Sequence, residues 1–292
     1  MTSTPEARER QTRLDDGAPS LFIVVPVLNE APNLERLIAA FHQLNTEFGL
    51  YYELQFVMVD DGSTDETAQL AQKLAQGLHF VVLSHQVNMG PGHAFGTAFE
   101  YLASRLRERD WVVTIEGDNT SRHELLRQML RRTEEGYEVI LASPYMYGGG
   151  ITKTSAWRVF LSHISNAFIK EALGIHGILT MSSFYRLYTG GVIKRLQAYY
   201  GPRIVERRGF ESMIELLLKM IFLGVKISEV PMLLDTSRRV GKSKMKIMRT
   251  ILGYLTIWKD RRRWQMMVDD RKLEIAGDPA TSGELDSPNS IY

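Results

Sequence analysis

Residues 54–65 read LQFVMVDDGSTD, an apolar run that ends abruptly in acidic and small polar residues. A short continuous apolar run rich in β-branched and aromatic residues predicts a strand buried on both faces. A helical pattern covers residues 66–76, and Ser63 or Thr64 is expected to be its N-cap. A buried strand, a polar loop and a helix in this order are typical of a parallel α/β sheet.

The same unit recurs on both sides of this stretch. Further strands are predicted at 21–27, 80–83, 111–115 and 138–142, and the helices between them at 34–44, 95–102 and 121–135. The fold class expected is therefore α/β, a Rossmann-like and mostly parallel sheet with helices on both faces. Ligands of such sheets bind at the carboxyl ends of the strands.

The second half of the chain is less regular. A glycine-rich loop over 143–156 precedes a helix at 157–173, and a helix near 210–222 precedes a strand at 225–230. We expect one α/β domain over 20–235, followed by a basic amphipathic helical segment at 236–268. The polar segment 1–19 has no apolar signal-peptide core, and we expect it and the tail 269–292 to be disordered.

Composition excludes several classes of protein. The 292 residues hold 35 Lys and Arg against 34 Asp and Glu, a net charge of +1 that argues against a general nucleic-acid binder. With no cysteine, the chain has no disulfide, thiolate nucleophile or Cys-ligated zinc. Charged residues interrupt the longest apolar stretch, 213–227, short of the roughly 20 apolar residues of a membrane span.

Acidic residues follow two of the predicted strands. Asp60 and Asp61 end one strand, and Glu116-Gly117-Asp118 ends another. In an extended segment Glu116 and Asp118 point to the same side, so they can share one hard cation such as Mg²⁺ or Mn²⁺. Gly117 between them is expected to let a ligand approach the backbone closely. Asp60 and Asp61 can hydrogen-bond ribose hydroxyls or a base edge, and we favour this over the simpler explanation of helix capping because a second strand also ends in acid.

Two other nucleotide motifs fail on spacing. The glycines of 90–96 (GPGHAFG) stand one residue too far apart for G-x-G-x-x-G and follow the third strand instead of the first. Gly241-Lys242-Ser243 resembles the end of a P-loop, but the required earlier glycine is Thr236. Neither NAD binding nor ATP hydrolysis is supported.

Positive charge concentrates late in the chain. Residues 238–263 hold ten Lys and Arg and one Asp, a local charge of +9 that includes the run Arg261-Arg262-Arg263. Aromatic and aliphatic residues recur along the same segment at helical spacing. Such a segment suits an anionic membrane surface or a phosphate-bearing substrate, and a solvated helix end is the plain alternative.

The chain resembles family 2 glycosyltransferases of the GT-A fold, and within them the dolichol-phosphate mannose synthase group. The resemblance runs from about Leu21 to Trp258 and rests on the order and spacing of its motifs. They are VPVLNE at 25–30, VDDGSTDET at 59–67, NMGPGHAFGTAF at 88–99, the EGD triplet, SPYMYGGG at 143–150, WRVFLSHISN at 157–166, SSFYRLY at 182–188 and RRVGKSKM at 238–245.

The resemblance implies an enzyme, an inverting and metal-dependent transferase that uses a nucleotide-sugar donor and a polyprenyl-phosphate acceptor. Asp118 would be central to catalysis, with Glu116 as the second ligand of a divalent cation. The nucleotide sugar would bind Pro26, Asn29, Glu30, Asp60 and Asp61. The acceptor and its phosphate would bind Arg158, Ser162, Arg186, Arg239 and Lys244. The protein would lie on the cytoplasmic face of a membrane as a peripheral protein.

Two alternatives stay open. A soluble transferase acting on a hydroxyl acceptor would need a general base, for which Glu211 is the candidate. Glu116 stands where the family has aspartate, and Pro144 stands where it has a phosphate-binding arginine. A non-catalytic nucleotide-sugar binder is therefore the third interpretation. The missing Gln of Gln-x-x-Arg-Trp before Arg263-Trp264 argues against a processive synthase.

Overall fold

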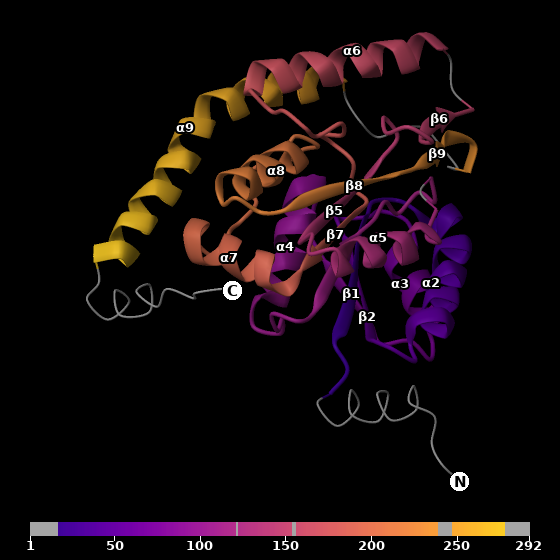
Figure 1. Cartoon of the computed structure of the whole chain (residues 1–292). Coiled ribbons are helices and arrows are strands. Elements are labelled where there is room, and N and C mark those ends of the chain that lie inside the picture. Colours follow the sequence, from indigo (N-terminus) through magenta and orange to yellow (C-terminus); the bar gives the residue numbers. More distant parts are fainter. Residues whose placement is uncertain (1–16, 121, 154–155, 239–246, 278–292) are drawn as a thin grey trace.

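A seven-stranded sheet forms the centre of the molecule (Figure 1). The computed structural model describes residues 17–120, 122–153, 156–238 and 247–277. The strand order is β3-β2-β1-β4-β7-β5-β8. Its strands are β1 (Ser20–Val27), β2 (Glu53–Asp60), β3 (Phe80–Ser84), β4 (Trp111–Thr114), β5 (Val139–Ser143), β7 (Arg186–Thr189) and β8 (Ile227–Pro231).

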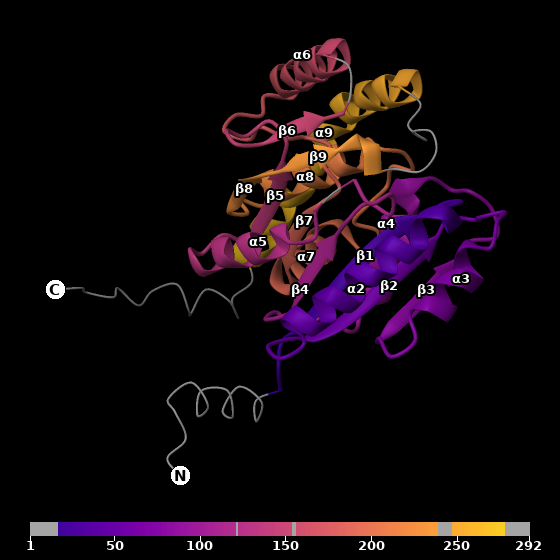
Figure 2. The same cartoon turned by 90° about the vertical axis from the view of Figure 1, so that its right-hand side faces the viewer.

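Helices cover both faces of this sheet (Figure 2). In β1 the side chains alternate: Ile23 and Val25 pack with one core cluster, while Phe22 and Val24 pack with the other. The first cluster includes residues of α2 (Leu34–Phe48), α3 (Thr67–Leu74) and α5 (Leu125–Glu134). The second includes residues of α4 (Pro91–Ala103), α7 (Gly190–Tyr200), α8 (Ser212–Phe222) and α9 (Ile247–Gly277). The predicted fold class is thus confirmed.

The register brings three strand ends together. Val27 of β1 pairs with Asp60 of β2, and Val24 of β1 pairs with Thr114 of β4, all in parallel. If this register is extended by two residues beyond Thr114, Glu116 lies beside the end of β1. The loops after β2 and β4 therefore flank the loop after β1, which is preceded by Pro26 and leads into the short helix η1 (Ala31–Asn33).

β7 is antiparallel to both of its neighbours, β4 and β5. The sequence did not predict this strand, nor α7, nor the small parallel sheet of β6 (Gly150–Thr152) and β9 (Leu233–Asp235). Each of these strands has only three or four residues, too few to show a period. The short 3-10 helix η2 (Thr236–Arg238) follows β9.

Two long helices, α6 (Ala156–Leu173) and α9, lie along one side of the molecule (Figure 1). Arg261 of α9 donates to the carbonyl of Ala172 at the end of α6, at 3.2 Å. α9 continues to Gly277, beyond Asp269, where the sequence suggested a disordered tail. In the described part of the chain, none of the helices combines the length and apolar composition needed to cross a bilayer.

Candidate active site

We name the carboxylates at the ends of β2 and β4, Asp60, Asp61, Glu116 and Asp118, the acidic edge. Asp60 and Asp61 are almost fully buried, while Glu116 and Asp118 are half-buried. They stand at the ends of β2 and β4, the two parallel neighbours of β1, so their negative charges gather at one end of the sheet. This is the position at which parallel sheets bind their ligands.

Asp61 fixes the loop before α4. Its two carboxylate oxygens accept the backbone N–H groups of Met89, at 2.9 Å, and Gly90, at 2.7 Å. His85 lies 2.8 Å from the same carboxylate through Nδ1 and contacts Thr97 through Nε2. The acidic edge is thereby joined to a loop that comes more than twenty residues later in the chain.

Asn29 joins the loops after β1 and β2. Its backbone N–H donates to the hydroxyl of Ser63, at 2.8 Å, and its side-chain oxygen accepts the N–H of Thr64, at 2.7 Å. Asn29 has a φ of 49°, a left-handed conformation that asparagine tolerates better than most residues. Ser63 and Thr64 are therefore not N-caps as predicted, because α3 begins only at Thr67 and their polar groups hold Asn29 instead.

Glu30 is buried beneath the same loop. Its backbone N–H donates to the hydroxyl of Thr67, at 2.9 Å, and its carboxylate accepts from the side-chain amide of Asn33. Neighbouring Pro26 is half-buried. The residues expected to bind the nucleotide thus lie together at the acidic edge.

Asp118 shapes the turn after β4. One oxygen of its carboxylate accepts both the backbone N–H and the hydroxyl of Thr120, at 3.1 and 2.7 Å. A Cβ placed on Gly117 would lie 2.9 Å from Val27 and 3.0 Å from the carbonyl of Pro26. β1 of the protein itself therefore requires a glycine at this position, and the approach of a ligand to Gly117 stays a prediction.

The acidic edge offers hard oxygen ligands from Glu116 and Asp118, which fit Mg²⁺ or Mn²⁺ in chemistry. Among the described residues, no three His, Cys, Asp or Glu side chains gather closely enough to hold a metal ion. Two carboxylates would leave most of the coordination shell of such an ion to other oxygen ligands, of the kind that a diphosphate can supply.

Arg186 does not face an open cleft. Its side chain is fully buried, and its guanidinium donates to the carbonyls of Ser183, Met181 and Met213 at 2.8 to 2.9 Å. Burial also lowers the pKa of Arg186. The structure thus gives this arginine a role in joining β7 to α8, which differs from the expected contact with phosphate.

The other expected acceptor residues are less defined. Arg158 and Ser162 belong to α6, and their side chains lie outside the described part of the structure, as do Arg239 and Lys244 entirely. Glu211 precedes α8, is half-buried, and accepts the N–H of Gly209 at 3.2 Å. A Cβ on Gly253 of α9 would lie 2.8 Å from the carboxyl carbon of Glu211, so α9 covers this side chain.

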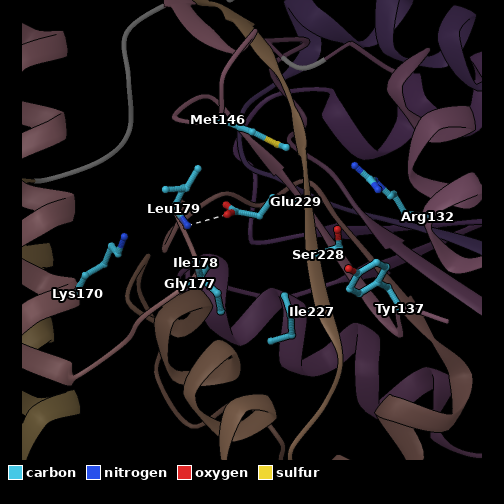
Figure 3. A pocket seen from close by; sticks show the side chains of 10 residues that line it. All are labelled: Arg132, Tyr137, Met146, Lys170, Gly177, Ile178, Leu179, Ile227, Ser228 and Glu229. Atoms are coloured by element: carbon cyan, nitrogen blue, oxygen red, sulfur yellow. Dashed lines mark hydrogen bonds between the residues drawn. The ribbon is translucent and has the colours of Figure 1, made fainter. Parts of the chain in front are cut away.

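A separate hollow of about 450 Å³ opens beside the edge strand β8 (Figure 3). It is lined by Arg132, Tyr137, Met146, Lys170, Gly177, Ile178, Leu179, Ile227, Ser228 and Glu229. Glu229 accepts the N–H groups of Leu179 and Thr180, at 2.7 and 2.8 Å. Because Ile227 is the first residue of β8, the hollow lies toward the opposite end of the sheet from the acidic edge.

Comparison with known proteins identifies the class. The family model described as glycosyl transferase family 2 matches residues 22–196, more than half of the chain, so the chain belongs to this family. The chain is therefore a glycosyltransferase, as the sequence predicted.

The particular relatives are lipid-phosphate sugar transferases by name. The chain is 27% identical over 228 residues to a polyprenol monophosphomannose synthase of Mycolicibacterium smegmatis, covering 77% of this chain and 80% of the relative. It is 26% identical over 247 residues to a dolichol-phosphate mannosyltransferase of Pyrococcus furiosus, covering 85% of this chain and 65% of that one. It spans only 42% of an undecaprenyl-phosphate 4-deoxy-4-formamido-L-arabinose transferase of Pseudomonas aeruginosa, at 29% identity over 158 residues and 52% of this chain.

Solved structures share the fold. A glucosyl-3-phosphoglycerate synthase of Mycobacterium tuberculosis superposes with a TM-score of 0.57 at 19% identity, over 86% of this chain and 83% of that one. The same enzyme with Mn²⁺, UDP and its product superposes with a TM-score of 0.55 at 18% identity, over 88% of this chain and 84% of that one. At this identity the likeness concerns the fold alone.

Proposed function

We propose that the protein is an inverting, metal-dependent transferase that moves a sugar from a nucleotide-sugar donor to a polyprenyl phosphate. The observation that carries the proposal is the acidic edge: Glu116 and Asp118 lie beside Asp60 across the end of β1. The names of the relatives over most of this chain favour a lipid-phosphate acceptor.

Each residue of the edge has a part in this proposal. Pro26, Asn29, Glu30, Asp60 and Asp61 would line the nucleotide pocket, and Glu116 and Asp118 would hold the cation. When bound, the cation would neutralise charge on the diphosphate leaving group. A phosphate oxygen of the acceptor attacks the anomeric carbon while the bond to the nucleoside diphosphate breaks. A single displacement of this kind inverts the anomeric configuration.

We propose that the acceptor and its phosphate bind Arg158, Ser162, Arg239 and Lys244. Arg186 is not part of this set, because its side chain is fully buried. A phosphate monoester is already anionic at neutral pH, so the reaction needs little help from a base. The alternative, a hydroxyl acceptor with Glu211 as general base, requires that carboxylate to reach the substrate. The close packing of Gly253 of α9 against the carboxylate of Glu211 argues against a role as general base.

Peripheral association with an anionic membrane surface belongs to the same proposal. Trp258 and Met266 of α9 are 56% and 61% exposed, and Arg262 is exposed between them. Residues four apart lie on one face of a helix, so these three form an outward stripe of aromatic, cationic and apolar side chains. This is the composition expected of a helix that lies at a lipid interface.

The test is an acceptor and donor panel with the full chain. GDP- and UDP-sugars with Mn²⁺ or Mg²⁺ are offered to vesicles that contain polyprenyl phosphate, and the lipid product is measured by mass spectrometry. We expect product from one donor, its loss with EDTA, an inverted anomeric centre by NMR, and near-normal turnover of Glu211→Gln. Transfer only to hydroxyl acceptors, abolished in Glu211→Gln, would replace this proposal with the alternative.

A further inference from the structure

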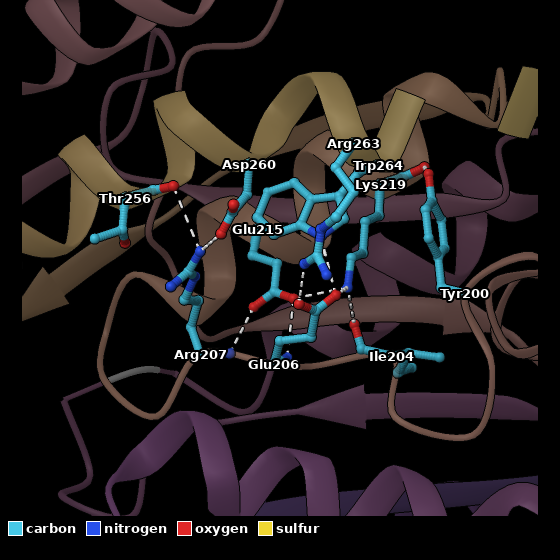
Figure 4. A network of polar contacts seen from close by, with 10 residues as sticks. All are labelled: Tyr200, Ile204, Glu206, Arg207, Glu215, Lys219, Thr256, Asp260, Arg263 and Trp264. Atoms are coloured by element: carbon cyan, nitrogen blue, oxygen red, sulfur yellow. Dashed lines mark hydrogen bonds and ion pairs between the residues drawn. The ribbon is translucent and has the colours of Figure 1, made fainter. Parts of the chain in front are cut away.

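A cluster of charged and polar side chains, all buried except Glu206, joins α8 to α9 (Figure 4). We name Glu206, Glu215, Lys219 and Trp264 the α8–α9 cluster. The ammonium of Lys219 is fully buried and lies 2.7 Å from Glu215 and 3.0 Å from Glu206. The indole N–H of Trp264, also fully buried, donates to the same oxygen of Glu206 at 2.9 Å. Glu206 therefore connects a lysine of α8 with a tryptophan of α9.

The α8–α9 cluster also fixes loop 204–211, which precedes α8. The carboxylate of Glu215 accepts the backbone N–H groups of Glu206 and Arg207, each at 2.9 Å. The ammonium of Lys219 donates to the carbonyl of Ile204 at 3.0 Å. The guanidinium of Arg207 forms an ion pair with Asp260 of α9. The backbone of the loop is thus held by α8 and by α9 together.

The far side of loop 204–211 presses on the start of α4. The carbonyl of Arg208 accepts the N–H of Gly92 at 2.8 Å. A Cβ on Gly90 would lie 2.3 Å from that carbonyl oxygen, and a Cβ on Gly92 would lie 2.2 Å from the carbonyl of Arg207. These contacts are between backbone atoms on both sides. A displacement of loop 204–211 therefore also displaces Gly90 and Gly92. Gly90 in turn donates to Asp61 at the acidic edge.

We propose that Trp264, Lys219 and Glu206 are positioning residues, through which the docking of α9 sets the place of Asp61 at the acidic edge. The path runs from Trp264 through Glu206 to loop 204–211, then to Gly90 and Asp61. Apolar side chains would hold the two helices together at a lower desolvation cost than buried ions. We therefore infer that the charged residues fix the position of α9 relative to α8 and loop 204–211. The proposal rests on the proposed function in one respect, that Asp61 lines the nucleotide pocket.

Titration calorimetry of the full chain with UDP and GDP in Mn²⁺ tests the coupling. Trp264→Phe keeps a ring in the core but removes the donor to Glu206, and we expect it to weaken nucleotide affinity by roughly three- to tenfold. In an Asp61→Asn background the same change should cost less than about twofold, because the path is already broken there. Gln265→Ala, an exposed neighbour, should have no effect. An unchanged affinity in Trp264→Phe, or equal losses in both backgrounds, overturns the proposal.

Amide hydrogen exchange gives a second reading that needs no ligand. We expect the segment 85–95, which contains Met89 and Gly90, to exchange faster in Trp264→Phe than in Gln265→Ala, while buried β1 exchanges at the same rate in both. A general loss of stability would accelerate β1 as well. Acceleration confined to α9 and loop 204–211 would overturn the coupling. If the wild type binds neither nucleotide, the proposed function fails, and the exchange result alone decides on the coupling.

Discussion

The acidic edge and the α8–α9 cluster both contain buried and partly exposed carboxylates, but they satisfy them in different ways. At the edge Asp60, Asp61 and Asp118 each accept backbone N–H groups, and those bound by Asp60 and Asp118 lie only two or three residues away. In the cluster Glu206 binds Lys219 and Trp264, the latter 58 residues on.

The difference separates two uses of buried charge. N–H groups orient a carboxylate without cancelling its charge, so the edge keeps a concentration of negative charge that a cation can use. In the cluster, Lys219 together with Arg263 offsets the charges of Glu215 and Glu206, so the cluster contributes to structure and position. We therefore expect damage to the cluster to appear in the free energy of unfolding and, through loop 204–211, in nucleotide affinity, whereas damage to the edge should appear in turnover.

The largest effect on stability is expected at Lys219. Lys219→Met leaves the fully buried Glu215 without its cation, while Glu206 keeps only its ion pair with Arg263, and the free energy of unfolding should fall by about 3–5 kcal/mol. Urea unfolding followed by circular dichroism measures the loss. Lys194→Met, at an exposed position of α7, is the matched control and should stay within about 0.5 kcal/mol of the wild type. A loss at Lys219 as small as that of the control would contradict this account of the cluster.

Asp118→Asn provides the opposite case. The amide oxygen can still accept the N–H of Thr120, so the turn is preserved, but the negative charge offered to a cation is gone. We expect turnover to fall by at least about a hundredfold, as for the loss of a main electrostatic contact in catalysis, with little change in urea midpoint. Assays with and without EDTA complete the measurement, since the variant should respond less to chelation. Retention of most of the activity would remove Asp118 from the metal site.

Gly90 lies at the junction of the two regions and should show both effects. It has a φ of 96°, and the carbonyl of Arg208 stands where a side chain would begin, so Gly90→Ala should cost about 1–3 kcal/mol. Gly77→Ala is the matched control, because Gly77 also has a positive φ, 86°, but no heavy atom within 4 Å of a Cβ. The comparison separates backbone strain from the close approach to Arg208. Equal losses of stability and nucleotide affinity in the two variants would show that the approach is unimportant.

The smallest effect expected is a dependence of stability on pH at Glu206. Partial burial by itself would raise its pKa, but Lys219, Arg263 and Trp264 together hold the pKa of Glu206 below its usual value. A lowered folded-state pKa means that the contribution of Glu206 is present above pH 4.5 and is lost as the pH falls below that value. Burial raises the pKa of Glu215, so its contribution to the free energy of unfolding changes with pH in the opposite direction. The difference between wild type and Glu206→Gln in urea melts from pH 7 to pH 3 isolates Glu206, and a difference that grows as the pH falls would contradict the assignment.

Much of the fold could be predicted from the sequence because the first five strands are apolar runs long enough to read. β7 could not, since the four residues RLYT are too few to show a period and include an arginine. The family resemblance assigned Arg186 to the acceptor phosphate, whereas the structure places it in the core, where backbone carbonyls hold its guanidinium. The sequence around Arg186 contains no pattern that predicts these carbonyl partners.

At the site, the sequence identified the carboxylates but not their contacts. Asp61 and Asp118 stand in motifs that can be read directly, whereas the N–H groups of Met89 and Gly90 reach Asp61 only through the fold. Glu215 and Lys219 are four residues apart, a spacing that predicts an ion pair on a helix. The structure contains this ion pair, at 2.7 Å. Glu206 and Trp264 carried no such signal.

The position of β7 also bears on how the chain folds as it is synthesised. The strands β1 to β4 are complete by residue 114 and pair with one another. The second edge of β4 stays unpaired until β7 has been synthesised. β5 has both of its final neighbours, β7 and β8, still to come, and the second ends at residue 231. An apolar strand with two unpaired edges is exposed to mispairing until its partners leave the ribosome. We therefore expect nascent chains halted between residues 150 and 185 to aggregate or to bind chaperones more strongly than chains halted near residue 115 or beyond 235.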